Sequence, residues 1–171
     1  MSVSHAKTEE KKKAEEAKKR KEQMNNWIIT QIVTVIIMIA GIGVLVYKTG
    51  QLPIPYLLGG LGIGVIVGLT RYFAAIKHKD IMMETWTLEQ AKKELKSTQM
   101  GKRYNIAYWG AIFALIMIFF TVPGVEFVNL VIAYFAINLV NEAIFLKYSY
   151  NLRQWKKDRE LRSTMERLGR R

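Results

Sequence analysis

The chain has 171 residues, of which 50% are hydrophobic and 23% are charged, and its formal net charge at pH 7 is +12. It contains no cysteine, which excludes disulfides, thiolate metal sites, iron–sulfur clusters and cysteine nucleophiles. Neither an aromatic-interleaved basic strand nor a zinc-ligand spacing accompanies the positive charge, so we expect no nucleic-acid partner.

The hydrophobic residues are concentrated in four segments, at 27–47, 54–73, 106–122 and 127–146. A soluble domain would interleave apolar and polar residues at a helical or strand period. Each segment is long enough, at 1.5 Å per residue, to cross or nearly cross a hydrocarbon core of about 30 Å. The sequence therefore predicts an all-α, polytopic membrane protein with four transmembrane helices arranged as two hairpins.

Residues 1–26 form a charged tract of Lys, Glu and Ala without an apolar stripe. This tract predicts either a solvated helix that continues into the first span or a disordered tail. We expect the tract to set topology, and the alternative is a docking arm for an acidic partner or ribosomal RNA. The first apolar segment begins at Trp27 and is too long for the apolar region of a signal peptide, so we expect it to remain as an anchor.

The second span is rich in glycine. Gly60, Gly64 and Gly68 recur every fourth residue, which places them on one helix face. Such ridges allow close approach of a second helix where lipid offers no hydrophobic driving force for association. We expect packing inside the chain against the first or third span, with docking to a glycine-rich helix of another protein as the alternative.

The connector 76–104 is charged, and Thr87 followed by Gln90 is typical of a capping box that starts a helix. Apolar residues at Leu88, Ala91 and Leu95 predict a short amphipathic helix on the membrane surface or against the tails. Pro123-Gly124 predicts a tight turn between the third and fourth spans. The basic segment 147–171 predicts a final charged helix.

Lys48 is the one basic residue in the two short linkers, and the other Lys and Arg residues lie in the tails, the connector and its flanks. Cytoplasmic loops carry such an excess. We therefore expect both termini and the connector to be cytoplasmic, in a cell (inner) membrane. Anionic lipid headgroups are then an expected partner.

Glu142 is a carboxylate inside an apolar segment, where a charge is costly and is usually paired. Arg71 and Arg103 lie at comparable depth and are the two candidate partners, while Asn138 and Tyr134 precede Glu142 by one and two helical turns. The cluster predicts an inter-helix polar clamp, or alternatively an ion or proton relay.

No catalytic, cofactor or metal site is expected. The two histidines, His5 and His78, lie outside the spans, and no nucleophile–base set or phosphate-binding loop is present in the sequence. We therefore expect a protein that is not an enzyme.

The second span ends Gly-Leu-Thr-Arg-Tyr-Phe-Ala-Ala at 68–75, Lys102-Arg103-Tyr104 opens the third, and Pro123 lies in the short second hairpin. With the charged connector, these features resemble the small four-span subunit I of bacterial F-type ATP synthases, the assembly protein I family, over residues 27–148. The resemblance implies help in assembling the membrane rotor ring, or in supplying Mg²⁺ or Ca²⁺ to that enzyme.

Three functions remain open from the sequence. The first is a non-enzymatic membrane assembly or accessory protein, which binds other membrane-protein subunits and possesses no site of its own. The second is a small ion transporter or channel that uses Glu142. The third is a structural accessory subunit of a large membrane complex.

Overall fold

The computed structural model describes residues 2–168, except for the side chains of residues 2–10, 13, 167 and 168. The described chain is all-helical, as predicted. The six helices are α1 (Ser2–Thr49), α2 (Ile54–Lys77), α3 (Lys79–Glu84), α4 (Leu88–Ser97), α5 (Gln99–Thr121) and α6 (Phe127–Leu168). The last residues of the basic C-terminal segment, 169–171, lie outside the described part.

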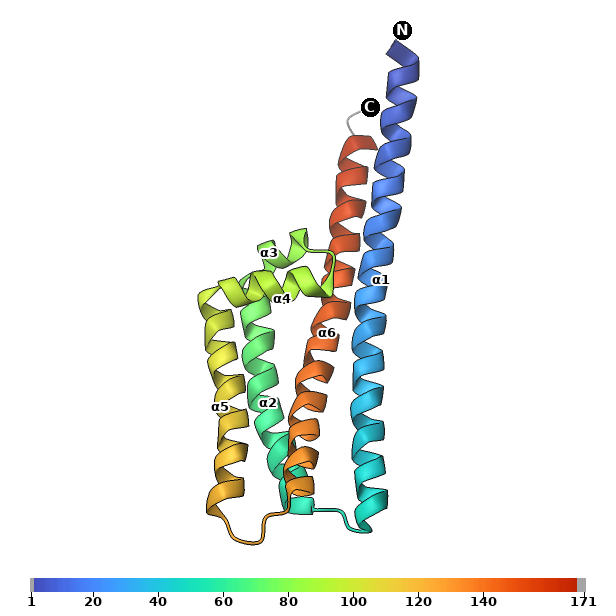
Figure 1. Ribbon diagram of the computed structural model, residues 1–171. Coiled ribbons are helices and arrows are strands. Elements are labelled where there is room, and N and C mark those ends of the chain that lie inside the picture. Colours follow the sequence, from blue (N-terminus) through green and yellow to red (C-terminus); the bar gives the residue numbers. More distant parts are fainter. Residues whose placement is uncertain (1, 169–171) are drawn as a thin grey trace.

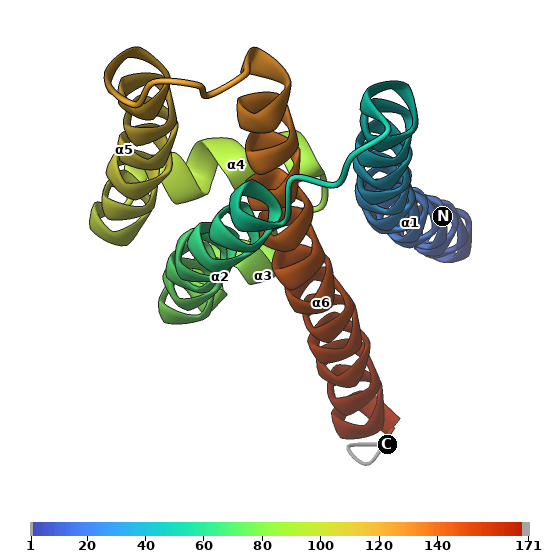
Figure 2. The same cartoon turned by 90° about the horizontal axis from the view of Figure 1, so that it is seen from below.

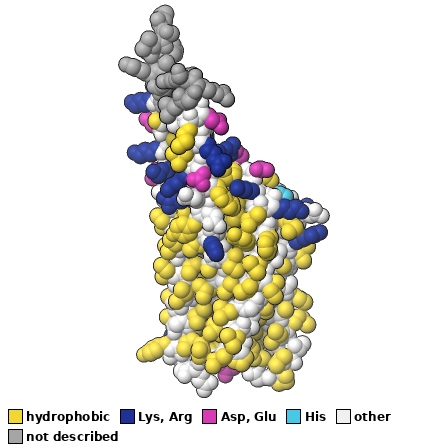
Figure 3. Space-filling view, turned by 180° about the vertical axis from the view of Figure 1, so that it is seen from behind, with side chains coloured by type: hydrophobic (Ala, Val, Ile, Leu, Met, Phe, Trp, Pro, Cys, Tyr) yellow, Lys and Arg dark blue, Asp and Glu magenta, His cyan; other side chains and the backbone are white. Residues whose placement is uncertain are grey.

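Four of these helices, α1, α2, α5 and α6, are long and apolar enough to cross a membrane. Hydrophobic side chains cover the bundle, while Lys, Arg, Asp and Glu gather towards one end (Figure 3). We call this the charged end: α3 and α4 lie across it, and α1 and α6 extend beyond it (Figure 1). The chain is thus an integral, multi-pass membrane protein.

The helices α1 and α6 are much longer than a bilayer requires. With 48 and 42 residues, they span about 70 and 60 Å, roughly twice the hydrocarbon thickness. The charged tract before Trp27 is therefore helical and continuous with the first span, which decides between the two alternatives. The expected C-terminal helix is likewise continuous with the fourth span rather than separate from it.

The turns and caps follow local sequence signals. Gly124 has φ of +81° in the turn after α5, as the Pro-Gly pair predicts, and Gly50 has φ of +67° after α1. Thr87 caps α4 by accepting a hydrogen bond from the Gln90 backbone N–H at 3.2 Å. The Gln90 side chain accepts from the Trp86 N–H instead of the Thr87 N–H, so the capping box is shifted by one residue. The helix α3 was not predicted.

Packing is organised around α6. Seen from below, α6 lies between α1 on one side and α2 and α5 on the other (Figure 2). Its most extensive contact is with α2, followed by α1, whereas α1 and α2 scarcely touch although a short turn joins them. The two hairpins predicted for the bilayer are therefore not the packing units of the chain.

The glycine ridge explains the close contact of α2 with α6. A Cβ built on Gly60 would lie 2.6 Å from the Ala133 carbonyl oxygen, and one on Gly64 would lie 2.9 Å from the Ile137 carbonyl oxygen. Gly68 faces Asn141 and Ile144 in the same way. The ridge thus packs inside the chain, but against the fourth span. The expectation of the first or third span was wrong, because helical periodicity gives the face of a ridge and not its partner.

The larger buried cluster lies at the charged end, where α1, α2, α3, α4 and α6 converge. Trp27 stacks on Phe145 and Phe145 on Tyr148, with ring centroids 6.3 and 5.6 Å apart. The second cluster, around Leu115, Ala133 and Ile137, is small. Helix α4 packs Ala91 and Leu95 into the larger cluster, so it covers the end of the bundle with its apolar face.

Candidate functional site

A buried ion pair joins α2 to α6 near the charged end. Arg71 Nη1 lies 2.8 Å from Glu142 Oε1, and the two side chains are 3% and 13% exposed. The guanidinium carbon Cζ of Arg71 also lies 3.6 Å from the centroid of the Phe145 ring. A planar guanidinium suits both contacts, since it donates in its plane and stacks through its face. Arg71 is therefore the partner of Glu142.

Arg103, the other candidate partner, lies elsewhere. Its side chain is exposed, and its Nη1 is 4.0 Å from the sulfur of Met100 in the preceding turn. The depth in the membrane expected from the sequence made Arg71 and Arg103 equally good candidate partners of Glu142. The two differ in direction around their helices, because Arg71 shares the α6-facing side of α2 with the glycine ridge.

The asparagines of α6 connect it to α5. Asn138 Nδ2 donates to the Tyr134 carbonyl at 2.9 Å, and Asn138 Oδ1 accepts from the Tyr108 hydroxyl at 3.1 Å. Asn141 Nδ2 donates to the Tyr104 hydroxyl at 3.3 Å. The Tyr134 side chain is 41% exposed, and its carbonyl is the group that accepts from Asn138.

Tyr104 and Tyr108 were not predicted as site residues. Their spacing of four residues places both hydroxyls on one face of α5. That spacing is the signal by which the sequence could have revealed them, but it gives no partner helix.

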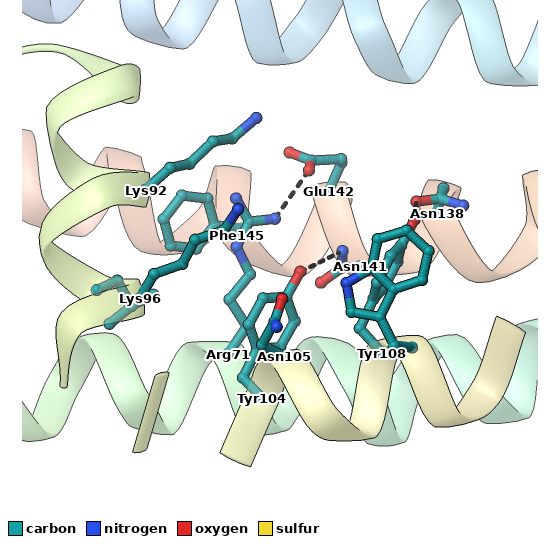
Figure 4. Close-up of a pocket in the computed structure, with 12 residues that line it drawn as sticks. Arg71, Lys92, Lys96, Tyr104, Asn105, Tyr108, Asn138, Asn141, Glu142 and Phe145 are labelled. Carbon is teal, nitrogen blue, oxygen red and sulfur yellow. Dashed lines mark hydrogen bonds and ion pairs between the residues drawn. The ribbon is translucent and has the colours of Figure 1, made fainter. Parts of the chain in front are cut away.

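These residues surround a cavity of about 300 Å³ between α2, α4, α5 and α6, which we call the polar cavity (Figure 4). Two lysines of α4, Lys92 and Lys96, complete its lining. Their spacing of one helical turn places both side chains on the cavity side of α4. The lining residues are Arg71, Lys92, Leu95, Lys96, Tyr104, Asn105, Tyr108, Trp109, Asn138, Asn141, Glu142 and Phe145.

The corner between α4 and α5 holds those lysines in place. Thr98 caps α5 by accepting from the Gly101 N–H at 3.0 Å, and its own hydroxyl donates to the Leu95 carbonyl. A Cβ on Gly101 would lie 1.7 Å from that carbonyl oxygen, so glycine is required at the corner. The corner turns α4 across the end of the helix bundle (Figure 1).

A second polar cluster lies beyond the spans. Lys156 donates to the Thr85 carbonyl and lies 3.9 Å from the centroid of the Trp86 ring. Arg159 Nη1 pairs with Glu84 Oε1 at 2.8 Å, with both side chains largely exposed. The hydrogen bond and the charge of Arg159 hold the pKa of the Glu84 carboxyl below its usual value. This cluster fixes the α3–α4 region to α6.

The described residues hold no group of three or more His, Asp or Glu side chains with metal-binding geometry. The prediction that the chain is not an enzyme, with no catalytic, cofactor or metal site, stays a prediction.

Comparison with protein-family models, with curated protein sequences and with solved structures gives no match. The resemblance to the ATP synthase subunit I family therefore stays a prediction as well.

Proposed function

We propose that the chain is a non-enzymatic membrane accessory or assembly protein that packs against subunits of a larger membrane complex. This proposal is supported by how little of α1 and α5 is buried inside the chain. Only 6% of the most apolar stretch of α5 and 11% of that of α1 is buried inside the chain, against 39% for α6. These helices offer long apolar faces to partners within the bilayer.

The exposed face of α5 has a regular pattern. Ile106, Phe113 and Phe120 are 72%, 63% and 76% exposed and recur every seven residues. A seven-residue repeat places side chains on one line of a helix, as in helices that pack on a partner helix. Aromatic side chains on that line supply large contact areas for van der Waals packing, which drives helix association in lipid.

The geometry of Glu142 favours a structural role over ion transport. Its carboxylate is already neutralised by the guanidinium of Arg71, which is itself held by Phe145. A pair of this kind joins α2 to α6, whereas an ion relay needs a carboxylate that is free to change partners. The transport alternative predicts a flux of protons, Na⁺ or Mg²⁺ in proteoliposomes that Glu142→Gln abolishes.

The orientation and the partner belong to the same proposal. The excess of Lys and Arg at the charged end supports a cytoplasmic location for that end, in the cell (inner) membrane. The resemblance stated above points to the rotor ring of an F-type ATP synthase as the partner. A permanent subunit differs from an assembly factor in its ratio to the complex, since the subunit is present in fixed stoichiometry in the finished enzyme.

Affinity purification after mild solubilisation, with quantitative mass spectrometry, tests the proposal. We expect a defined set of membrane subunits at a reproducible ratio, reduced by Phe113→Ala/Phe120→Ala. The matched control is Leu58→Ala/Ile66→Ala, two exposed residues of α2, which leaves the ratio unchanged. A monodisperse chain without other subunits contradicts the proposal, and equal losses in both variants contradict the assigned face.

A further inference from the structure

We propose that the polar cavity binds the phosphate of a phosphoester that also carries a hydroxyl group, and that its source is the headgroup of an anionic phospholipid. The headgroup site lies inside the chain, whereas the acyl chains would share with the proposed partner the face of α5 at Ile106 and Phe113. Three features favour this ligand, namely the charge of the cavity, a buried acceptor within it, and the surface next to it.

The charge of the cavity is positive once its internal ion pair is counted. Arg71 and Glu142 neutralise each other, which leaves the two ammonium groups of Lys92 and Lys96. Among the described side chains, neither lysine forms an ion pair with a carboxylate. Both extend from α4 towards the cavity (Figure 4). Two lysines one helical turn apart attract a single anionic group that has two terminal oxygens, such as the phosphate of a diester.

The lining also offers hydrogen-bonding groups that the chain itself does not use fully. The Tyr104 hydroxyl accepts from Asn141 and keeps its own O–H to donate. Asn141 Oδ1 is buried, in a residue only 2% exposed, and has no hydrogen-bond partner among the described residues. A buried acceptor without a partner is costly. A ligand that fits must therefore present a donor as well as an anion.

A phosphodiester with a hydroxyl-bearing headgroup meets both requirements. Its phosphate oxygens accept from the lysines and from the Tyr104 hydroxyl, and its hydroxyl donates to Asn141 Oδ1. A headgroup whose cationic end lacks any donor, such as choline, leaves Asn141 unsatisfied and brings no net negative charge to the lysines.

The neighbouring surface points to a lipid as the source. Trp109 lines the cavity and is also exposed on the outer face of α5, where Ile106 and Phe113 continue the apolar surface. Acyl chains attached to a headgroup in the cavity would lie along this surface. The depth of the polar cavity in the membrane also suits a lipid headgroup. Arg71 and Glu142 lie one to two turns from the charged ends of their spans, at the depth of the headgroups. Basic pockets between helices at this depth are typical sites for anionic headgroups.

Native mass spectrometry of the full chain tests the proposal, after extraction from nanodiscs that contain phosphatidylcholine and phosphatidylglycerol. The ionic strength is kept at about 0.5 M ammonium acetate, because salt screens lipids held only by surface charge. We expect one retained phosphatidylglycerol per chain. Lys92→Gln/Lys96→Gln weakens its retention by about 30-fold, and Tyr104→Phe weakens it by several-fold while leaving the charge unchanged.

The matched control is Lys93→Gln/Lys102→Gln, which removes the same charge from two lysines that are exposed, as Lys92 and Lys96 are, but do not line the cavity. We expect this variant to retain the lipid as the original chain does. Equal losses in the two double variants overturn the proposal, as does equal retention of phosphatidylcholine. Excess glycerol 3-phosphate distinguishes the two sources. Retention that persists in its presence supports the lipid, and complete displacement overturns the lipid assignment.

Discussion

Glu142 and Glu84 are both paired with an arginine at 2.8 Å, yet their environments differ. The Arg71–Glu142 pair is buried, while the Arg159–Glu84 pair is exposed. Removing one partner of a buried pair leaves an uncompensated charge, at a cost of about 3–5 kcal/mol. We expect Glu142→Gln to lower the free energy of unfolding by that order, and Glu84→Gln by less than about 1 kcal/mol.

Denaturant unfolding in detergent micelles measures both changes. The double substitution Arg71→Met/Glu142→Leu provides the control, because it removes the two charges together. We expect it to be less destabilising than Glu142→Gln alone, since no buried charge is left unpaired. Equal, small effects of Glu142→Gln and Glu84→Gln would show that the buried pair does not join α2 to α6 in the way described.

At the scale of the helices, the contact of α2 with α6 depends on backbone approach. A methyl group at Gly60 would meet the backbone of α6 at Ala133, which has no room to yield, whereas a Cβ at Gly62 meets nothing within 4 Å. We expect Gly60→Ala to cost about 1–3 kcal/mol through overpacking. Gly62→Ala should be neutral or stabilising by up to about 1 kcal/mol, because alanine is the better helix former.

Thermal unfolding of the two glycine variants in the same detergent is the measurement. The pair is closely matched, because both substitutions add one methyl group to the same apolar helix two residues apart. A Gly62→Ala variant as unstable as Gly60→Ala would contradict the assigned face of the ridge.

The sequence predicts the helices better than their arrangement. Four blocks of apolar residues specify the spans, because a bilayer demands about 20 such residues for each crossing. The apolar pattern does not specify which spans pack together, because lipid removes the hydrophobic driving force between helices. The glycine ridge was therefore recognised from its spacing, while its partner, α6, was not.

The residues of the candidate site, like the fold, were predicted in part. Glu142 stood out because a carboxylate in an apolar segment needs a partner, and Asn138 shares its face. Arg71 and Arg103 differ only in rotation around their helices, which depth in the membrane does not reveal. Lys92 and Lys96 belong to a connector whose position depends on the corner at Gly101, so their place over the polar cavity emerges only from the fold.

At the scale of the whole molecule, we propose that the chain crosses the membrane four times and that its charged regions share one side. The described helices agree with this arrangement, because α3, α4 and the charged parts of α1 and α6 all lie at one end (Figure 1). The charge distribution predicts that this end is cytoplasmic. The turns at Gly50 and Gly124 then face the opposite side.

The most direct test is cysteine labelling, which the chain permits because it has no cysteine of its own. Single cysteines replace exposed residues at the charged end (Ala17, Ser97, Ser163) and in the two opposite turns (Gln51, Glu126). With a membrane-impermeant maleimide on intact cells, we expect labelling of Gln51→Cys and Glu126→Cys alone, and of the other three only after permeabilisation. Labelling of Ser97→Cys or Ser163→Cys in intact cells, or protection of either turn, would contradict the account.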